Sequence, residues 1–156
     1  MLEIAIPGRD PLRLKYLVLD LNGTLALDGQ LLPGVRERLE ALSNQLEIWL
    51  ITADTHGTLT TLAYTLKVSL RRVEPQVATA QKGALVEELG AAQVAAIGNG
   101  VNDADMLRRA ALGIAVLGPE GLSTACLFAA DLLAPNIEAA LDLLLHPRRL
   151  VATLRT

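Results

Sequence analysis

Two short segments of this 156-residue chain combine residue types that could carry out phosphoryl transfer. Residues 20–24 read Asp-Leu-Asn-Gly-Thr, and residues 98–103 read Gly-Asn-Gly-Val-Asn-Asp. Each segment follows a short apolar run that is typical of a buried strand. Parallel strands bind ligands at their carboxyl ends, so Asp20 and Asp103 should meet in one crevice if the two strands are neighbours. Such a crevice would suit transfer of a phosphoryl group to an aspartate, with Mg²⁺ beside it.

Phosphoryl transfer through an aspartate needs an attacking carboxylate, a metal ion, a hydroxyl and a cation that hold phosphate oxygens, and a group that activates water. Asp20 fits the nucleophile, and Thr24 fits a hydroxyl that shapes the site. Thr52, at the end of the next apolar run, fits the phosphate-binding hydroxyl, and Lys82, near the start of a helix, fits the cation. Each residue alone has an ordinary structural explanation. Their occurrence together, in order, at predicted strand ends and helix starts favours the functional one.

The elements that must position these residues alternate along the chain. We expect strands over residues 2–6, 12–19, 46–51, 68–70, 94–97, 114–116 and 132–133, and helices over residues 33–44, 58–66, 81–89, 103–111, 120–130 and 137–145. This alternation predicts a doubly wound, mostly parallel Rossmann-like α/β sheet in a single domain over residues 1–156. The first two strands should form an N-terminal edge hairpin. Residues 25–32, with Asp28-Gly29 as the turn, should form a small flap over the site.

Local signals predict where three helices begin or end. Pro33 should be the first residue of its helix, and Thr79 should cap the helix that begins near Gln81. Gly113 should close the helix over residues 103–111.

Composition excludes several classes of function. The net charge of −3 argues against a general nucleic-acid binder. No apolar run approaches the roughly 18 residues of a membrane span, and the N-terminus does not resemble a signal peptide. The single cysteine, Cys126, allows no internal disulfide and is expected in the core. We therefore expect a cytoplasmic protein that binds neither nucleic acid nor membrane.

These ordered segments resemble the four motifs of the haloacid dehalogenase (HAD) superfamily, over about residues 15–133. Residues 20–24 together with residues 98–104 are most similar to the phosphorylation domain of P-type cation ATPases. Because the chain shows no membrane segment and no long insertion, it resembles the capless, soluble P-type-ATPase-like HAD hydrolases. The resemblance implies a HAD fold without a cap domain, a phosphorylated substrate, and Mg²⁺ as the cofactor.

The resemblance also implies roles for individual residues. The catalytic residues would be Asp20, Asn22, Thr52 and Lys82. The residues that contact substrate or phosphate would be Gly23, Thr24, Ala53 and Asn102. The Mg²⁺ ligands would be Asp20, the backbone carbonyl of Asn22, Asn99 and Asp103.

Two residues depart from the pattern of this superfamily. HAD phosphatases usually carry a second Asp where this chain has Asn22, and an amide cannot act as a general acid or base. P-type ATPases also lack that Asp, yet they form the aspartyl-phosphate because their leaving group is a good one. The second departure is Asn99, where the superfamily usually has a metal-ligating Asp. The amide still offers an oxygen, but the site loses one negative charge.

The intervals from Asp20 to Thr52 and from Thr52 to Lys82 are filled by the flap, helices and a short strand. Neither interval has room for a cap domain, so the site should be open to a macromolecule or covered by a second subunit. The apolar flap and the N-terminal hairpin are the candidate contacts of such a homo-oligomer.

Three functions remain open. The first is an Mg²⁺-dependent hydrolase acting through phosphorylated Asp20. The second, motivated by Asn22 and Asn99, is a regulatory or phosphate-sensing protein with weakened catalysis. The third is a switch in which the phosphoenzyme accumulates. Near Thr52, His56 could line the site and Asp54 could cap the next helix.

Overall fold

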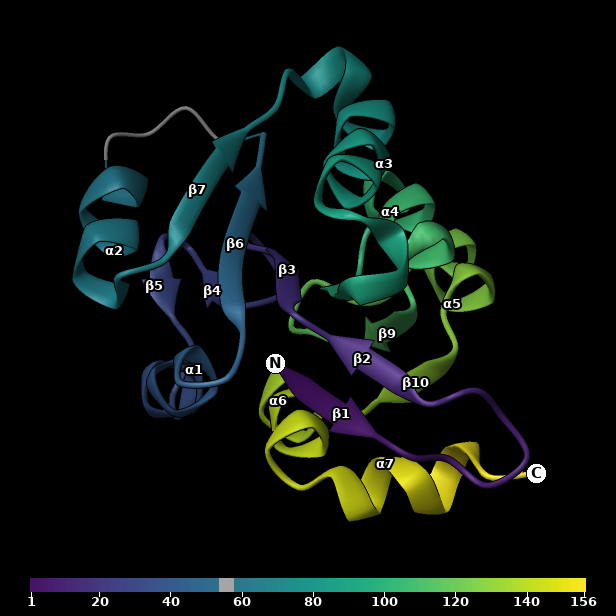
Figure 1. Cartoon of the computed structure of the whole chain (residues 1–156). Coiled ribbons are helices and arrows are strands. Elements are labelled where there is room, and N and C mark those ends of the chain that lie inside the picture. Colours follow the sequence, from purple (N-terminus) through teal and green to yellow (C-terminus); the bar gives the residue numbers. More distant parts are fainter. Residues whose placement is uncertain (54–57) are drawn as a thin grey trace.

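The computed structural model describes residues 1–53 and 58–156, and its centre is a parallel sheet of six strands (Figure 1). In spatial order the strands are β10 (Leu132–Ala134), β9 (Leu112–Val116), β8 (Val94–Gly98), β3 (Tyr16–Asp20), β6 (Glu47–Thr52) and β7 (Ser69–Arg72). Every neighbouring pair runs parallel. The predicted doubly wound α/β fold is therefore confirmed.

The apolar runs form central strands because both faces of the sheet are covered by helices. In β3, Leu17 and Leu19 pack into the apolar cluster on one face, whereas Val18 packs into the cluster on the other face. This alternation directs Asp20 toward the same face as Val18. The side chain of Asp20 therefore faces the helices of that layer.

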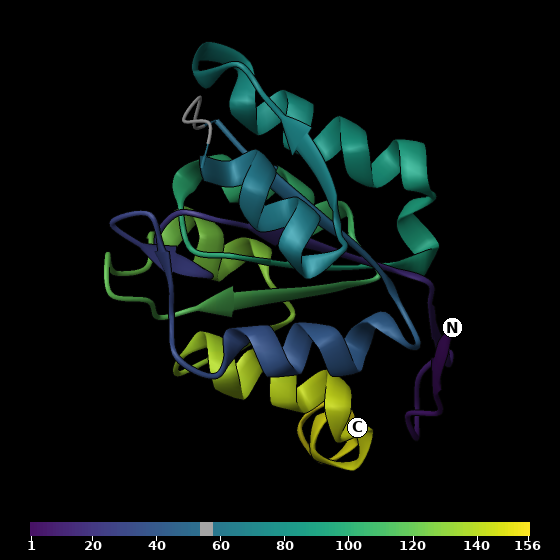
Figure 2. The ribbon, with the colours of Figure 1, turned by 90° about the vertical axis from the view of Figure 1, so that its left-hand side faces the viewer.

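Helices form one layer on each face of the sheet (Figures 1 and 2). On the first face lie α1 (Val35–Ser43), α2 (Thr58–Leu66), α6 (Ile137–Leu145) and α7 (Pro147–Leu154). On the second face lie α3 (Ala78–Leu89), α4 (Ala104–Arg109) and α5 (Thr124–Ala129). Single 3₁₀ turns precede several elements: η1 (Pro75–Val77), η2 (Ala91–Gln93) and η3 (Val101–Asp103).

The chain enters the sheet at its centre and reverses its direction of travel once. From β3 it moves outward to β6 and β7, then returns to β8 on the other side of β3 and continues to β9 and β10. Leu19 of β3 pairs with Leu50 on one side and with Ile97 on the other. The carboxyl ends of β3 and β8 thus flank a topological switch point, where open α/β sheets bind their ligands.

The predicted N-terminal hairpin is present as strands β1 (Leu2–Ile4) and β2 (Leu12–Leu14), which pair as a separate two-stranded sheet. It leads into the central strand β3 and does not extend an edge of the large sheet. The expected strand over residues 12–19 is interrupted at Lys15, whose backbone bonds to Gln93 and Glu47 of neighbouring segments. The apolar residues of the hairpin are buried in the core of the same chain: Leu2, Ile4, Ile6 and Leu14.

The predicted flap is also present, as strands β4 (Ala26–Leu27) and β5 (Gln30–Leu31). Asp28 has a φ of 50° and Gly29 a φ of 79°, as a two-residue hairpin turn requires.

Several helix boundaries differ from the sequence-based expectation; α5, expected from residue 120, begins at Thr124 because residues 118–121 form a turn. Helix α1 begins at Val35, after Gly34 with a φ of 75°, so Pro33 lies outside the helix. The η1 turn runs directly into α3, so Thr79 lies within the helix and does not cap it. All three starts are set by the preceding turn, which the local residue preferences did not reveal.

Helix α4 ends at Arg109, and Gly113 lies inside β9. A Cβ at position 113 would lie 2.5 Å from the carbonyl oxygen of Leu107, so the glycine permits close packing of β9 against α4. Helix α7, which begins with Pro147, was not expected from the sequence. Among the helices of the described segments, none has both the length and the apolarity of a membrane span.

Candidate active site

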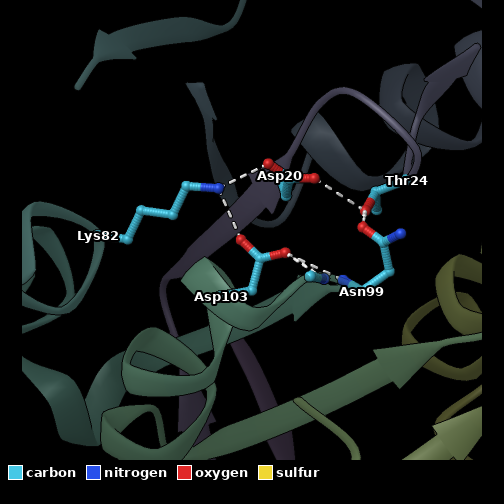
Figure 3. Close-up of polar contacts among 6 residues, drawn as sticks. Asp20, Thr24, Lys82, Asn99 and Asp103 are labelled. Atoms are coloured by element: carbon cyan, nitrogen blue, oxygen red, sulfur yellow. Dashed lines mark hydrogen bonds and ion pairs between the residues drawn. The ribbon is translucent and has the colours of Figure 1, made fainter. Parts of the chain in front are cut away.

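The predicted site residues gather at the carboxyl edge of the sheet, around the switch point. Asp20 is the last residue of β3, and Thr52 is the last residue of β6. Asn99 and Asp103 lie in the connection between β8 and α4. Lys82 lies on α3, on the buried stripe that faces the sheet. The structure thus brings together side chains from three separate parts of the chain, residues 20–24, 82 and 99–103 (Figure 3). Thr52 ends the strand next to β3.

Lys82 lies between two carboxylates. Its Nζ is 2.6 Å from Oδ1 of Asp20 and 2.6 Å from Oδ1 of Asp103. The side chain of Lys82 is 1% exposed, and that of Asp103 is fully buried. A buried ammonium is tolerated only when it is paired and hydrogen-bonded, and here two carboxylates share that role. The three groups together carry one net negative charge.

The second oxygen of Asp20 faces other oxygen atoms. The Thr24 hydroxyl lies 3.1 Å from Oδ2 of Asp20 and 3.0 Å from Oδ1 of Asn99. A hydroxyl has a single proton, so it donates to only one of these two acceptors at a time. The arrangement therefore places a carboxylate oxygen and an amide oxygen on either side of one hydroxyl (Figure 3).

The amide of Asn99 is oriented by a hydrogen bond on its far side. Nδ2 donates to the backbone oxygen of Gly121 at 3.1 Å, which turns Oδ1 toward Thr24. Asp103 is fixed in a similar way, because its Oδ2 accepts from the backbone N–H groups of Asn99 (3.0 Å) and Gly100 (2.9 Å). Both oxygens of Asp103 are therefore engaged, one by backbone and one by Lys82.

Burial governs the ionisation of the nucleophile candidate. Burial raises the pKa of Asp20 to about 6, and the nearby Asp103 carboxylate adds to this shift, whereas Lys82 and Thr24 oppose it. For Lys82, burial lowers the pKa, but the two carboxylates outweigh burial and raise it above its usual value. Lys82 therefore remains charged at neutral pH, and any further cation near Asp20 would favour the carboxylate form.

The oxygen atoms at Asp20 and Asn99 fit a hard divalent cation. Mg²⁺ prefers oxygen ligands and is usually held by one or two carboxylates together with waters. The inward-facing amide oxygen of Asn99 and the second oxygen of Asp20 are donors of this kind. Oδ2 of Asp103 accepts two backbone hydrogen bonds, but Oδ1 accepts only the one from Lys82 and keeps a lone pair for a metal ion.

The remaining predicted residues lie around this centre. Gly23 has a φ of 77° in the loop after β3, and the half-buried Asn22 precedes it. Thr52 is buried; its neighbour Ile51 pairs with Asp20, so Thr52 lies one residue beyond Asp20 along the sheet. Ala53 follows β6, and the half-buried Asn102 lies in η3. Asp54 and His56 lie outside the described residues.

Sequence reasoning missed the connection between β9 and α5. Besides the bond from Asn99 to the Gly121 carbonyl, the backbone N–H of Ser123 donates to the Asn99 carbonyl at 2.9 Å. The available signal was the Gly-Pro-Glu-Gly turn of residues 118–121, which follows an apolar strand at the same edge of the sheet.

Cys126 of α5 packs behind the site as a core residue, as predicted. Burial raises the pKa of its thiol to about 12, and the charges of Asp103 and Asp20 contribute to this shift. The side chain therefore remains a neutral thiol at physiological pH, which does not favour a nucleophilic role.

Comparison with known proteins yields one match to a family model. Residues 6–111 match the model of the haloacid dehalogenase-like hydrolases. Two uncharacterised proteins of Methanocaldococcus jannaschii match shorter segments. MJ0073 is 46% identical over 63 residues, which are 40% of this chain and 68% of that protein. MJ0072 is 51% identical over 39 residues, which are 25% of this chain and 89% of that protein.

Several solved structures share the fold. The 3-deoxy-D-manno-octulosonate 8-phosphate phosphatase of Moraxella catarrhalis, in complex with magnesium, phosphate and a KDO molecule, has a TM-score of 0.68 at 22% identity, over 91% of this chain and 94% of that chain. A probable YrbI-family phosphatase of Pseudomonas syringae has a TM-score of 0.71 at 17% identity, over 93% of this chain and 95% of that one. A zinc-transporting PIB-type ATPase has a TM-score of 0.60 at 22% identity, over 80% of this chain and 20% of that chain.

Proposed function

Because the chain belongs to the haloacid dehalogenase-like hydrolase family, and is thus a hydrolytic enzyme, we propose that it is an Mg²⁺-dependent phosphohydrolase that acts through a phosphorylated Asp20. The observation that carries this proposal is the environment of the Asp20 carboxylate. One oxygen is paired with the buried ammonium of Lys82, and the other faces the oxygens of Thr24 and Asn99. A carboxylate in this position can attack phosphorus while a cation stands on each side of it.

In the first step a carboxylate oxygen of Asp20 forms a bond to phosphorus, and the bond from phosphorus to the leaving oxygen breaks. In the second step water attacks the phosphorus of the aspartyl-phosphate, which releases phosphate and restores the carboxylate. Lys82 uses two of its three ammonium protons on Asp20 and Asp103, so one remains for a phosphate oxygen. The Thr52 hydroxyl, at the end of the neighbouring strand, is proposed to hold another phosphate oxygen.

Mg²⁺, held by Asp20 and Asn99 together with the Asn22 carbonyl, would neutralise charge on the phosphate oxygens. The hard oxygen donors of the site support this choice of metal. The phosphatase of Moraxella catarrhalis, with which the chain shares its fold, is in complex with magnesium and phosphate. Asp103 is proposed as a further Mg²⁺ ligand, and it also orients Lys82 and the backbone of Asn99.

The proposed substrate class is an activated phosphate, either an anhydride or an ester with a good leaving group. Asn22 cannot protonate a poor leaving group, because its amide is neither a general acid nor a general base. The motif of residues 20–24 and the fold shared with the PIB-type ATPase support a P-type-ATPase-like first step. The net charge of −3 further favours a small phosphorylated substrate over nucleic acid.

A regulatory or phosphate-sensing protein is the second candidate, because Asn22 and Asn99 both replace carboxylates. The two functions differ in turnover: a sensor would bind phosphate without releasing product. A homo-oligomer remains a proposal as well. The N-terminal hairpin offers little apolar surface for a contact between subunits, because its apolar residues are buried within the same chain.

The test is steady-state hydrolysis of an activated aryl phosphate with and without Mg²⁺. We expect metal-dependent turnover in the wild type and its loss in Asp20→Asn. Asp10→Asn is the matched control, because it removes an exposed carboxylate near the N-terminal hairpin and should retain activity. Equal turnover in wild type and Asp20→Asn would overturn the proposal. Phosphate binding without turnover in either protein would favour the sensor.

A further inference from the structure

A tight turn after β9 lies at the same edge of the sheet as the candidate active site. It comprises residues 118–121, Gly-Pro-Glu-Gly, and the N–H of Gly121 donates to the carbonyl of Gly118 at 2.9 Å. Pro119 occupies the second position of the turn, where its fixed φ is favourable. Glu120 is the next residue, so its backbone is held by the closed turn although its side chain is exposed to solvent.

This turn is packed between the two loops that carry the predicted motifs. Gly118 lies against the loop after β3 so closely that a Cβ at position 118 would overlap the carbonyl oxygen of Gly23. The carbonyl of Gly121 accepts from Nδ2 of Asn99 at 3.1 Å, and the N–H of Ser123 donates to the carbonyl of Asn99 at 2.9 Å. The position of the turn is therefore set by its contacts with Gly23 and Asn99.

The carboxylate of Glu120 points back over Gly23. A Cβ built at Gly23 would overlap this carboxylate and would lie 2.9 Å from its Cδ. The same point lies 3.1 Å from Nδ2 of Asn99. The Glu120 carboxylate and the Asn99 side chain thus share one side of Gly23. The Asn99 atom on this side is Nδ2, and the oxygen Oδ1 at the other corner of the same amide faces Thr24.

We propose that Glu120 supplies to the cation site the negative charge that Asn99, as an amide, does not provide. The proposal rests on the proposed function, since it concerns the metal of that same site. Asp20, Asp103 and Lys82 together carry one net negative charge, which leaves a divalent cation half neutralised. The carboxylate of Glu120 brings the count to two. Its carboxylate is exposed and lies beside the Asn99 amide, so it would act on the cation through a water.

The hydrogen bonding of Asn99 supports an amide at position 99 with the negative charge at position 120. An aspartate at position 99 would place a carboxylate oxygen where Nδ2 now donates to the Gly121 carbonyl, so two acceptors would face each other. That aspartate would also lie beside Glu120. The amide at position 99 is thus matched to a carboxylate at position 120, and each explains the presence of the other.

The test is Mg²⁺ affinity of the full chain by titration calorimetry, measured without substrate. We expect Glu120→Gln to weaken Mg²⁺ binding about tenfold, as for other outer groups of metal sites. Glu40→Gln is the matched control, because it removes an exposed carboxylate of α1 and should leave the affinity unchanged. Asn99→Asp should strengthen binding much more in the Glu120→Gln background than in the wild type, because only there does it restore the charge count.

Equal Mg²⁺ affinities of wild type and Glu120→Gln would overturn the proposal, as would equal effects of Asn99→Asp in the two backgrounds. A loss of turnover in Glu120→Gln at unchanged Mg²⁺ affinity would also overturn it and would indicate an acid–base role. The calorimetric result does not depend on hydrolysis. Failure of the proposed function, with metal bound but no turnover, is therefore distinguishable from failure of this inference.

Discussion

At the scale of single residues, Lys82 determines how the site is charged. It pairs with Asp20 and Asp103 at the same distance of 2.6 Å and keeps two buried carboxylates from facing each other unscreened. Burial nevertheless raises the pKa of Asp20 to about 6, so the nucleophile candidate is held in an environment that disfavours its charge. Such a group is stabilised when a substrate or metal brings positive charge, which is typical of functional sites.

The raised pKa of Asp20 predicts a pH-dependent effect of Asp20→Asn on stability. The folded-state pKa of about 6 exceeds the ordinary aspartate pKa of 3.8, so the wild type loses stability as pH rises between these values. Asparagine does not ionise. We expect Asp20→Asn to increase the free energy of unfolding at about pH 8 by roughly 3 kcal/mol. The measurement is urea denaturation in a metal chelator, and the same difference at about pH 4 would contradict this explanation.

The amide of Asn22 predicts a rate effect that depends on the leaving group. We expect Asn22→Asp to raise turnover of an alkyl phosphate by about 10²–10⁴-fold, because general acid–base catalysis becomes available. Turnover of an activated aryl phosphate should change far less. Steady-state rates on both substrates check this, with Asn44→Asp at the end of α1 as the control. A uniform change on both substrates would argue against an acid–base explanation.

At the scale of elements, the site depends on how helices and turns begin. Helix α5 is capped by Ser123, whose hydroxyl accepts from the N–H of Cys126 at 3.1 Å. The same residue binds the carbonyl of Asn99 through its own N–H. Helix α6 has an equivalent cap, Asn136, which accepts from the N–H of Ala139 at 2.8 Å and lies outside the site. Comparing variants of the two caps therefore distinguishes loss of helix stability, which both should show, from loss of site geometry, which only the Ser123 variant should show.

We expect Ser123→Ala and Asn136→Ala each to lower the free energy of unfolding by about 1 kcal/mol, as the loss of a helix cap does. Only Ser123→Ala should also weaken Mg²⁺ binding and turnover, because it loosens the start of α5 next to Asn99. Denaturation curves and calorimetric titration of both variants check the two effects. Equal Mg²⁺ affinities of the two variants would show that the cap does not position the site.

At the scale of the whole molecule, one sheet separates two apolar clusters, and the site lies at its carboxyl edge. Leu39 of α1 belongs to one cluster and Leu85 of α3 to the other, and each side chain is buried. The central strand β3 contributes to both clusters, Leu17 to the first and Val18 to the second. A single cooperative unit over residues 1–156 is therefore the expected behaviour.

We expect Leu39→Ala and Leu85→Ala each to lower the free energy of unfolding by about 2–5 kcal/mol. In each variant, fluorescence of the single tryptophan, Trp49, and far-ultraviolet circular dichroism should report the same transition. Trp49 lies on β6, the strand next to the central strand β3. Two separate transitions in either variant would indicate more than one folding unit.

The sequence by itself determined most of the elements and named the candidate site residues, because both depend on local signals. Each apolar run and the Asp28-Gly29 turn lie within a short window of the chain, and each candidate site residue stands at the end of such a run or near the start of a helix. The strand ends and the two hairpins were therefore predictable. The starts of α1 and α3 were less predictable, because the turn before each helix sets where it begins.

Only the tertiary structure decided which groups meet. The pairing of β3 with β8, the position of Lys82 between two carboxylates and the packing of the turn at Glu120 against Gly23 all join distant parts of the chain. The orientation of the Asn99 amide depends on a carbonyl 22 residues away. Such contacts arise from burial and hydrogen bonding across the whole fold, for which no short stretch of sequence carries a signal.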